Sequence, residues 1–219
     1  FRSAGQRCSA LRVLFVQDEV ADRIIGLLQG AAAELVIGDP MDLPTDIGPV
    51  IDDAARAALA AHAARMAKAG TTLIDLAVPA GLETGCFFGP KAYEISSLDL
   101  LTREVFGPIL HVVRYEASRL DAVIDAINAT GYGLTLGVHS RIEAVQRHIA
   151  GRVRAGNAYV NRSMIGATVG TQPFGGEGLS GTGPKAGGPH YLPRFAVERV
   201  VSVNTAAAGG NTSLVTLGE

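Results

Sequence analysis

The apolar positions of this chain alternate between short runs and helix-spaced stripes, and the alternation predicts its first elements. Residues 13–16, VLFV, form an apolar run typical of a short buried strand. Asp18 offers an N-cap for the helix that follows, whose apolar positions have helical spacing: Val20, Ile24, Leu27 and Leu28. Prolines and glycines then interrupt residues 38–50, which predicts a surface loop.

A second helix and two strands are predicted next. Asp52 and Asp53 open an alanine-rich helix that runs to about Ala69 and ends at Gly70. Stretches rich in β-branched and aromatic residues predict strands at 71–78 and 86–95.

Strands and helices alternate regularly after residue 108. Strands are predicted at 109–116, 134–140 and 157–161, with helices between them at 118–133, capped by Ser118, and at 141–153. This βαβαβ order predicts an α/β fold with a mainly parallel sheet covered by helices. Glycines and prolines fill residues 162–190, a loop long enough to be functional. Residues 194–205 alternate like a strand, and 206–219 predict a flexible tail.

Composition excludes several classes of function. Hydrophobic residues make up 47% of the 219 positions and charged residues 18%, as in a soluble globular domain. The net charge of −2 and the scattered basic residues predict neither nucleic-acid nor membrane-surface binding, so the expected partner is a small molecule. Two cysteines make no disulfide framework, which favours a reducing, cytoplasmic setting. Because Phe1 opens a polar loop without a start methionine, we expect part of the chemistry to lie upstream.

Two thiols differ in their surroundings. A free cysteine is more often a small buried hydrophobe than a nucleophile, but the neighbours of Cys8 in GQRCS are not core residues. The guanidinium of Arg7 would favour the reactive thiolate. Cys86 stands between a glycine and two phenylalanines, and is expected in the core.

Three other features of the sequence resemble functional motifs. GEGLSG at 176–181 fits a dinucleotide fingerprint, but prolines and glycines follow it where a helix is required, and Pro184 stands where a phosphate loop needs lysine. Glu104 and Phe106 lie two positions apart before a strand; the ordinary interpretation places the ring in the core and the carboxylate on the surface. The five histidines show no metal-ligand spacing, so no metal is expected.

Four motifs in order, GQRCSALR, REVFGPIL, GNAYVNR and GATVGTQPFGGEGLSGTGPKAGGP, resemble the catalytic half of the aldehyde dehydrogenase superfamily. Their wording is most similar to the glutamate-semialdehyde (pyrroline-5-carboxylate) dehydrogenase part of bacterial proline utilization A. The resemblance implies a catalytic domain at 1–193, an oligomerisation-flap strand at 194–205 that pairs in a homo-oligomer, and the tail at 206–219.

The resemblance also implies roles for individual residues. Cys8 would be the nucleophile that attacks the aldehyde, and its backbone N–H would supply half of the oxyanion hole. Glu104 would hold the nicotinamide ribose of NAD and Phe106 would pack near its ring, which reverses the ordinary interpretation of that pair. The carboxylate end of the substrate would be bound by Ser9, Gly166 and Ala167. Phe174 would pack against the aliphatic part of the substrate. Some relatives carry serine at position 167, so one side-chain hydrogen bond is absent here.

The family's other machinery precedes the cysteine loop: a second oxyanion donor (asparagine), a water-activating glutamate and a Rossmann cofactor domain. None lies in these 219 residues, so the chain alone is expected to be inactive and to need that cofactor domain as its partner. FAD is implied only if a proline dehydrogenase domain lies upstream. The alternatives are a non-catalytic structural domain of the same fold, a dehydrogenase for another small aldehyde, and a thiol redox protein, which would need a resolving cysteine near Cys8.

Overall fold

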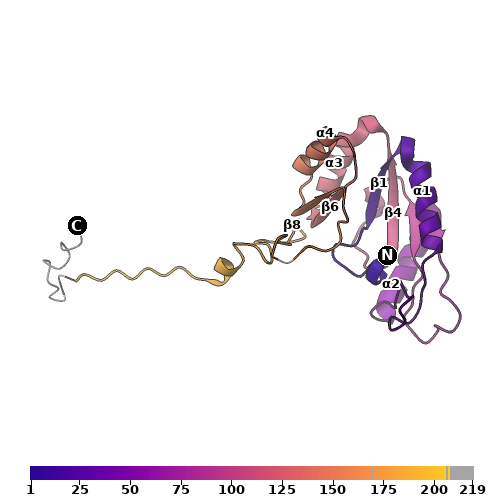
Figure 1. Ribbon diagram of the computed structural model, residues 1–219, viewed down its shortest axis with the longest axis horizontal. Helices are drawn as coiled ribbons and strands as arrows, with labels where there is room; N and C mark the ends of the chain where they lie inside the picture. Colours follow the sequence, from indigo (N-terminus) through magenta and orange to yellow (C-terminus); the bar gives the residue numbers. More distant parts are fainter. Residues whose placement is uncertain (169, 206, 208–219) are drawn as a thin grey trace.

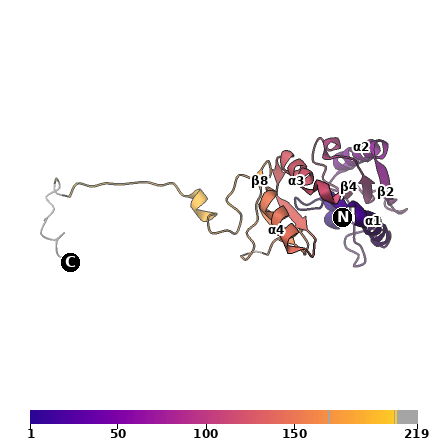
Figure 2. The ribbon, with the colours of Figure 1, turned by 90° about the horizontal axis from the view of Figure 1, so that it is seen from above.

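The computed structural model describes residues 1–168, 170–205 and 207. A four-stranded sheet lies between two helices, a smaller α/β unit lies beside it, and the C-terminal segment runs away from both (Figures 1 and 2). No helix in these residues is long and apolar enough to span a membrane. The tail predicted at 206–219 falls outside the described residues, apart from Ala207.

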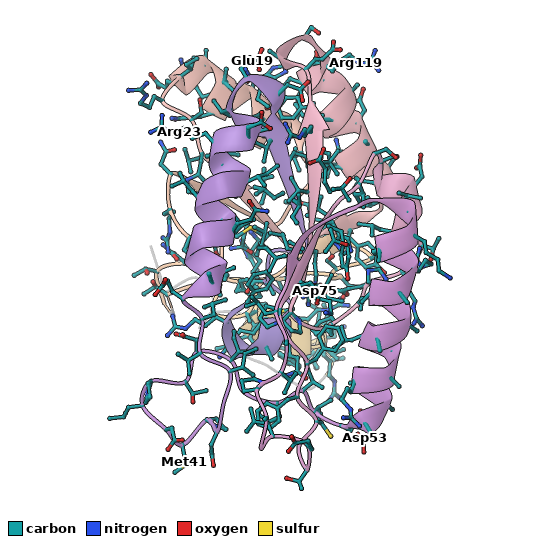
Figure 3. All side chains as sticks on the ribbon, turned by 90° about the vertical axis from the view of Figure 1, so that its right-hand side faces the viewer. Glu19, Arg23, Met41, Asp53, Asp75 and Arg119 are labelled. Atoms are coloured by element: carbon teal, nitrogen blue, oxygen red, sulfur yellow. The ribbon has the colours of Figure 1, made fainter. Side chains whose placement is uncertain are left out.

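The main sheet is mixed but mainly parallel. Its strands lie in the order β1-β4-β3-β2, with β4 parallel to both neighbours and β2 antiparallel to β3. The helices α1 and α2 cover its opposite faces (Figure 3). The bounds of these elements are β1 Val13–Gln17, α1 Asp18–Ala33, α2 Asp53–Ala69, β2 Thr71–Asp75, β3 Lys91–Glu94 and β4 Ile109–Tyr115.

Alternation along β4 divides the core into two layers. Leu110 and Val112 belong to the cluster beneath α1, whereas Ile109 and Val113 belong to the cluster beneath α2. Successive side chains of a strand point to opposite faces. His111, between Leu110 and Val112, is therefore directed toward α2, where it is buried.

The smaller unit follows β4. Its α4 connects the parallel strands β6 and β7, while β5 pairs antiparallel with β8 from the glycine-rich loop. The predicted alternation is confirmed in its order, and its strands fall into separate sheets, because β4 pairs with β1 and β3 whereas β6 pairs with β7. Gly131, with φ of +74°, turns the chain after α3 into β5. The bounds are α3 Leu120–Ala129, β5 Tyr132–Gly133, β6 Thr135–Val138, α4 Glu143–Arg152, β7 Asn157–Val160 and β8 Glu177–Gly178.

The start of α2 agrees with its prediction, whereas the starts of α1 and α3 differ from theirs. Asp52 caps α2 as expected, its carboxylate accepting a hydrogen bond from the Ala55 N–H at 2.7 Å, and Gly70 follows the last residue of α2. Asp18 is the first residue of α1 rather than its cap and makes no capping bond. Ser118 lies in the short 3-10 helix η3, Ala117–Arg119, that precedes α3. The strand expected over 86–95 is limited to β3.

The C-terminal segment differs from its prediction. Leu192–Phe195 form a short 3-10 helix, η4, and the residues from 196 to 205 form neither helix nor strand. They lead away from the body (Figures 1 and 2), with Val197 and Val200 each more than 90% exposed. A strand exists only through ladder hydrogen bonds to a neighbouring strand, and among the described residues no strand pairs with residues 197–203. The loop at 162–190 is irregular as predicted, apart from β8 and one bridge between Phe174 and Ala186.

Candidate active site

The loop that carries Cys8 begins in an unusual backbone conformation. Ser3, Ala4 and Gly5 all have positive φ, near +50° to +64°, within the short 3-10 helix η1, Arg2–Gly5. Such values cost energy for residues other than glycine, so the surrounding structure must hold them. A side chain on Gly5 would clash with the backbone carbonyl of Gly107, so the two backbones touch.

Cys8 lies at the surface of this loop. Its turn is closed by a hydrogen bond from the Ala10 N–H to the Arg7 carbonyl at 3.1 Å, and the neighbouring Ser9 is buried. The thiol is exposed, so the interpretation of Cys8 as a buried hydrophobe is wrong. Cys86 is half-buried at the edge of the core, and burial raises the pKa of its thiol.

Arg12, the residue directly before β1, holds the cysteine loop. Its guanidinium donates to the carbonyls of Gly5 at 2.6 Å and Arg7 at 3.1 Å, and to the carbonyl of Gly107 at 3.3 Å. Three backbone carbonyls from two distant segments therefore converge on one planar cation. The cation that serves this loop is thus Arg12, whereas the exposed Arg7 donates to Ser3.

The same guanidinium faces Glu104 and Phe106. Arg12 Nε lies 3.7 Å from Glu104 Oε1, and Arg12 Cζ lies 4.6 Å from the centroid of the Phe106 ring, within cation–π range. Burial lowers the pKa of Arg12, and the negative charges of Glu104 and of a Cys8 thiolate oppose that shift. Phe106 is 44% exposed, so the ordinary interpretation of this residue as part of the core is wrong, and Glu104 is at the surface.

A buried pair of histidines holds the main-chain carbonyl of Arg12. His111 Nδ1 lies 3.0 Å from the Arg12 carbonyl, the two Nε2 atoms of His111 and His62 are 2.9 Å apart, and Arg65 lies 3.1 Å from His62 Nδ1. A carbonyl only accepts and a guanidinium only donates, so Arg65 donates to His62, His62 to His111, and His111 to Arg12. Both rings are therefore neutral. Burial lowers the pKa of His62 to about 4, and the repulsion that an imidazolium at His111 and the cations of Arg65 and Arg103 would exert on a charged His62 adds to the shift.

The remaining predicted site residues lie in the glycine-rich loop. Gly166 has φ of +76°, Ala167 is half-buried, and Phe174 exchanges two backbone hydrogen bonds with Ala186. No hydrogen bond or ion pair between described residues joins this group to Cys8 or Ser9. The structure therefore brings together the cysteine loop, Glu104 and Phe106 through Arg12, whereas the placement of Gly166, Ala167 and Phe174 at the site stays a prediction.

Two functional candidates were not found from the sequence. The sequence position of Arg12 could have indicated its role, because a charged residue directly before a buried strand needs a hydrogen-bond or ion-pair partner. No feature of the sequence indicates the contact between His62 and His111, since the two residues are 49 positions apart. A recess of about 770 Å³ between α2 and β2 contains no predicted site residue, and its cations are already paired, Arg56 with Asp53 and Lys91 with Asp75.

Comparisons with known proteins identify the family of this chain. A family model described as the aldehyde dehydrogenase family matches residues 1–201. The bifunctional protein PutA of Klebsiella aerogenes is 53% identical over 205 residues, covering 91% of this chain and 16% of that protein. A crystal structure of a Bradyrhizobium japonicum proline utilization A mutant superposes with a TM-score of 0.89 at 61% identity, covering 95% of this chain and 21% of that one. A Thermus 1-pyrroline-5-carboxylate dehydrogenase with bound NAD superposes with a TM-score of 0.78 at 30% identity, covering 88% and 37%.

Proposed function

The chain belongs to the aldehyde dehydrogenase family, and we propose that residues 1–193 are the catalytic domain of an NAD-dependent dehydrogenase that oxidises L-glutamate γ-semialdehyde to L-glutamate in proline catabolism. The chain spans 16% of the Klebsiella PutA and 21% of the Bradyrhizobium structure, so the activity proposed is that of the intact protein. The single observation that supports it most is the exposed Cys8 thiol on a loop held against Glu104 and Phe106 through Arg12.

The proposed chemistry starts at the Cys8 sulfur. The thiolate attacks the carbonyl carbon of the aldehyde and forms a C–S bond, and the carbonyl oxygen becomes the oxyanion of a thiohemiacetal. The backbone N–H of Cys8 has no hydrogen-bond acceptor among the described residues, so it is free to donate to that oxygen. Collapse of the oxyanion expels a hydride and leaves a thioester, which water then hydrolyses to the acid and the free thiol.

NAD, when bound, accepts that hydride. The residues present fit this cofactor: Glu104 offers a surface carboxylate to ribose hydroxyls, and Phe106 exposes an aromatic surface beside it. The remainder of NAD would need the upstream cofactor domain, which the family places before the cysteine loop. We therefore propose that the 219 residues alone do not turn over.

Substrate recognition is proposed for both loops. Ser9 follows the nucleophile and is 4% exposed, which suits a hydroxyl that binds a desolvated carboxylate. Gly166 and Ala167 would offer backbone N–H groups to the same carboxylate, and Phe174 would wall the aliphatic part. A carboxylate held beside Cys8 would favour an acidic semialdehyde over an uncharged aldehyde.

Assembly is proposed through the C-terminal segment. Its valines at 197, 200, 201 and 203 are each at least 68% exposed, and a strand of a second copy would cover them. The resulting homo-oligomer and a cytoplasmic setting are both predictions. FAD belongs to the proposal only if a proline dehydrogenase domain precedes this chain.

The test uses the intact protein and its two cysteines. Cys8→Ser should abolish NADH formation from glutamate semialdehyde, while Cys86→Ser, the matched control, should retain it. A higher kcat/KM for glutamate semialdehyde than for succinate semialdehyde supports the proposed substrate; the reverse favours another small aldehyde. Unchanged dehydrogenase activity in Cys8→Ser would contradict the proposal and favour a structural domain.

A further inference from the structure

We propose that Arg12 is a positioning residue that orients the oxyanion donor of the cysteine loop and couples this loop to Glu104. The inference rests on the proposed function, in which Cys8 is the nucleophile and Glu104 binds the cofactor. It assigns a role to Arg12, which is neither of these. In this proposal Arg12 does not touch the substrate; it acts by holding the Arg7 carbonyl and the Glu104 carboxylate in position.

The main chain of Arg12 is fixed from β4. Its carbonyl accepts two hydrogen bonds from His111, one from the backbone N–H at 3.0 Å and one from the ring Nδ1 at 3.0 Å. His111 is 4% exposed and is held in turn by His62. The guanidinium therefore extends from a rigid, buried base.

The side chain of Arg12 fixes the direction of the Cys8 peptide. Arg12 Nη2 donates to the Arg7 carbonyl at 3.1 Å, and this carbonyl also accepts from the Ala10 N–H. In a trans peptide the carbonyl of one residue and the N–H of the next point in opposite directions. Holding the Arg7 carbonyl toward Arg12 therefore turns the Cys8 N–H away from it, which leaves this N–H available to an oxyanion.

The other side of the guanidinium reaches the proposed cofactor residues. Arg12 Nε is buried and has no hydrogen-bond partner in the described part of the chain; the Glu104 carboxylate at 3.7 Å lies just beyond hydrogen-bond distance. Phe106 lies against the guanidinium plane, and Gly107 contributes a third carbonyl. Only the planar, five-donor fork of arginine can serve these groups together, whereas lysine presents a single point charge.

The experiment measures steady-state kinetics of the intact dehydrogenase with Arg12→Gln, Arg12→Lys, Glu104→Gln and the Arg12→Gln/Glu104→Gln double variant. Arg12→Gln should lower kcat/KM for NAD by about 10- to 100-fold, the range expected when a charged hydrogen bond is lost, and Arg12→Lys should not restore it. Because the residues act as a unit, the double variant should be within about threefold of the more severe single variant.

The matched control is Arg114→Gln. Arg114 is 31% exposed and pairs with Asp22 at 2.7 Å and Glu94 at 2.9 Å, farther along β4 from the site. Its loss should lower the melting temperature without changing kcat/KM for NAD by more than about twofold, which separates positioning from a general structural role.

Two results would overturn the inference: multiplicative effects of the Arg12 and Glu104 substitutions, or wild-type kinetics in Arg12→Lys. If Arg12→Gln does not fold, Arg12→Lys and its combination with Glu104→Gln carry the same test. Activity that survives Cys8→Ser refutes the proposed function itself. Loss of activity in Cys8→Ser together with independent Arg12 and Glu104 effects refutes only the role of Arg12.

Discussion

Acidification should destabilise the fold through the histidine pair beneath the cysteine loop. Burial lowers the pKa of His62 from its ordinary 6.5 to about 4, and it also lowers the pKa of His111. In the unfolded chain the ring regains its ordinary pKa, so between pH 6.5 and 4 the unfolded state binds a proton that the folded state excludes. The stabilisation is therefore fully present above pH 6.5 and is lost as the pH falls through this window.

The size of the effect follows from the shift. One pKa unit corresponds to about 1.4 kcal/mol, so His62 alone should contribute about 3 kcal/mol to the free energy of unfolding at pH 7, of which about 2 kcal/mol is lost by pH 5. The hydrogen-bond chain gives the structural cause. A proton added to His62 goes to Nδ1, which already faces an Arg65 N–H at 3.1 Å, and one added to His111 goes to Nε2, which faces the His62 N–H at 2.9 Å, so either protonation sets two N–H groups against each other.

The assay is urea unfolding of the 219-residue chain, followed by circular dichroism from pH 7.5 to 5, a range in which ordinary carboxylates stay ionised. In His62→Gln a neutral amide can donate to His111, so at least half of the pH-dependent decrease in the free energy of unfolding should disappear. His190→Gln changes an exposed histidine and should keep the wild-type slope. An unfolding free energy that stays level from pH 7 to 5, or an unaltered slope in His62→Gln, would refute the reasoning.

Two further predictions concern the packing behind the cysteine loop. Leu59→Ala should cost about 3 kcal/mol of unfolding free energy by chemical denaturation, because Leu59 is 1% exposed and packs against Gly107, whereas Leu27→Ala, at a 63% exposed position, should cost less than about 0.5 kcal/mol. Gly5→Ala should lower stability by more than about 1 kcal/mol and change the iodoacetamide alkylation rate of Cys8, followed by peptide mapping. Gly81→Ala shares the positive φ but meets no atom within 4 Å, so equal costs for the two glycine variants would contradict the close approach of Gly5 to Gly107.

Local patterns were enough for most elements. The stripe of α1, the Asp52 cap and Gly70 end of α2, and the apolar run of β4 are set by residues within a few positions of one another, so their elements could be predicted. The motif around Cys8 also identified the candidate nucleophile. Capping by Asp18 and Ser118 failed because the true helix starts depend on how the preceding residues turn.

The site required the tertiary structure. Sequence alone determined the αβ order, the cysteine loop and the Glu104–Phe106 pair, because each is encoded by neighbouring residues. The tertiary structure decided that β4 and β6 lie in separate sheets, that Arg12 rather than Arg7 serves the cysteine loop, and that His62 lies opposite His111. The contacts of Arg12 with Gly107 and His111, and of His62 with His111, join residues 49 to 99 positions apart, and they form only when strand pairing and helix packing bury their polar groups and require each to find a partner.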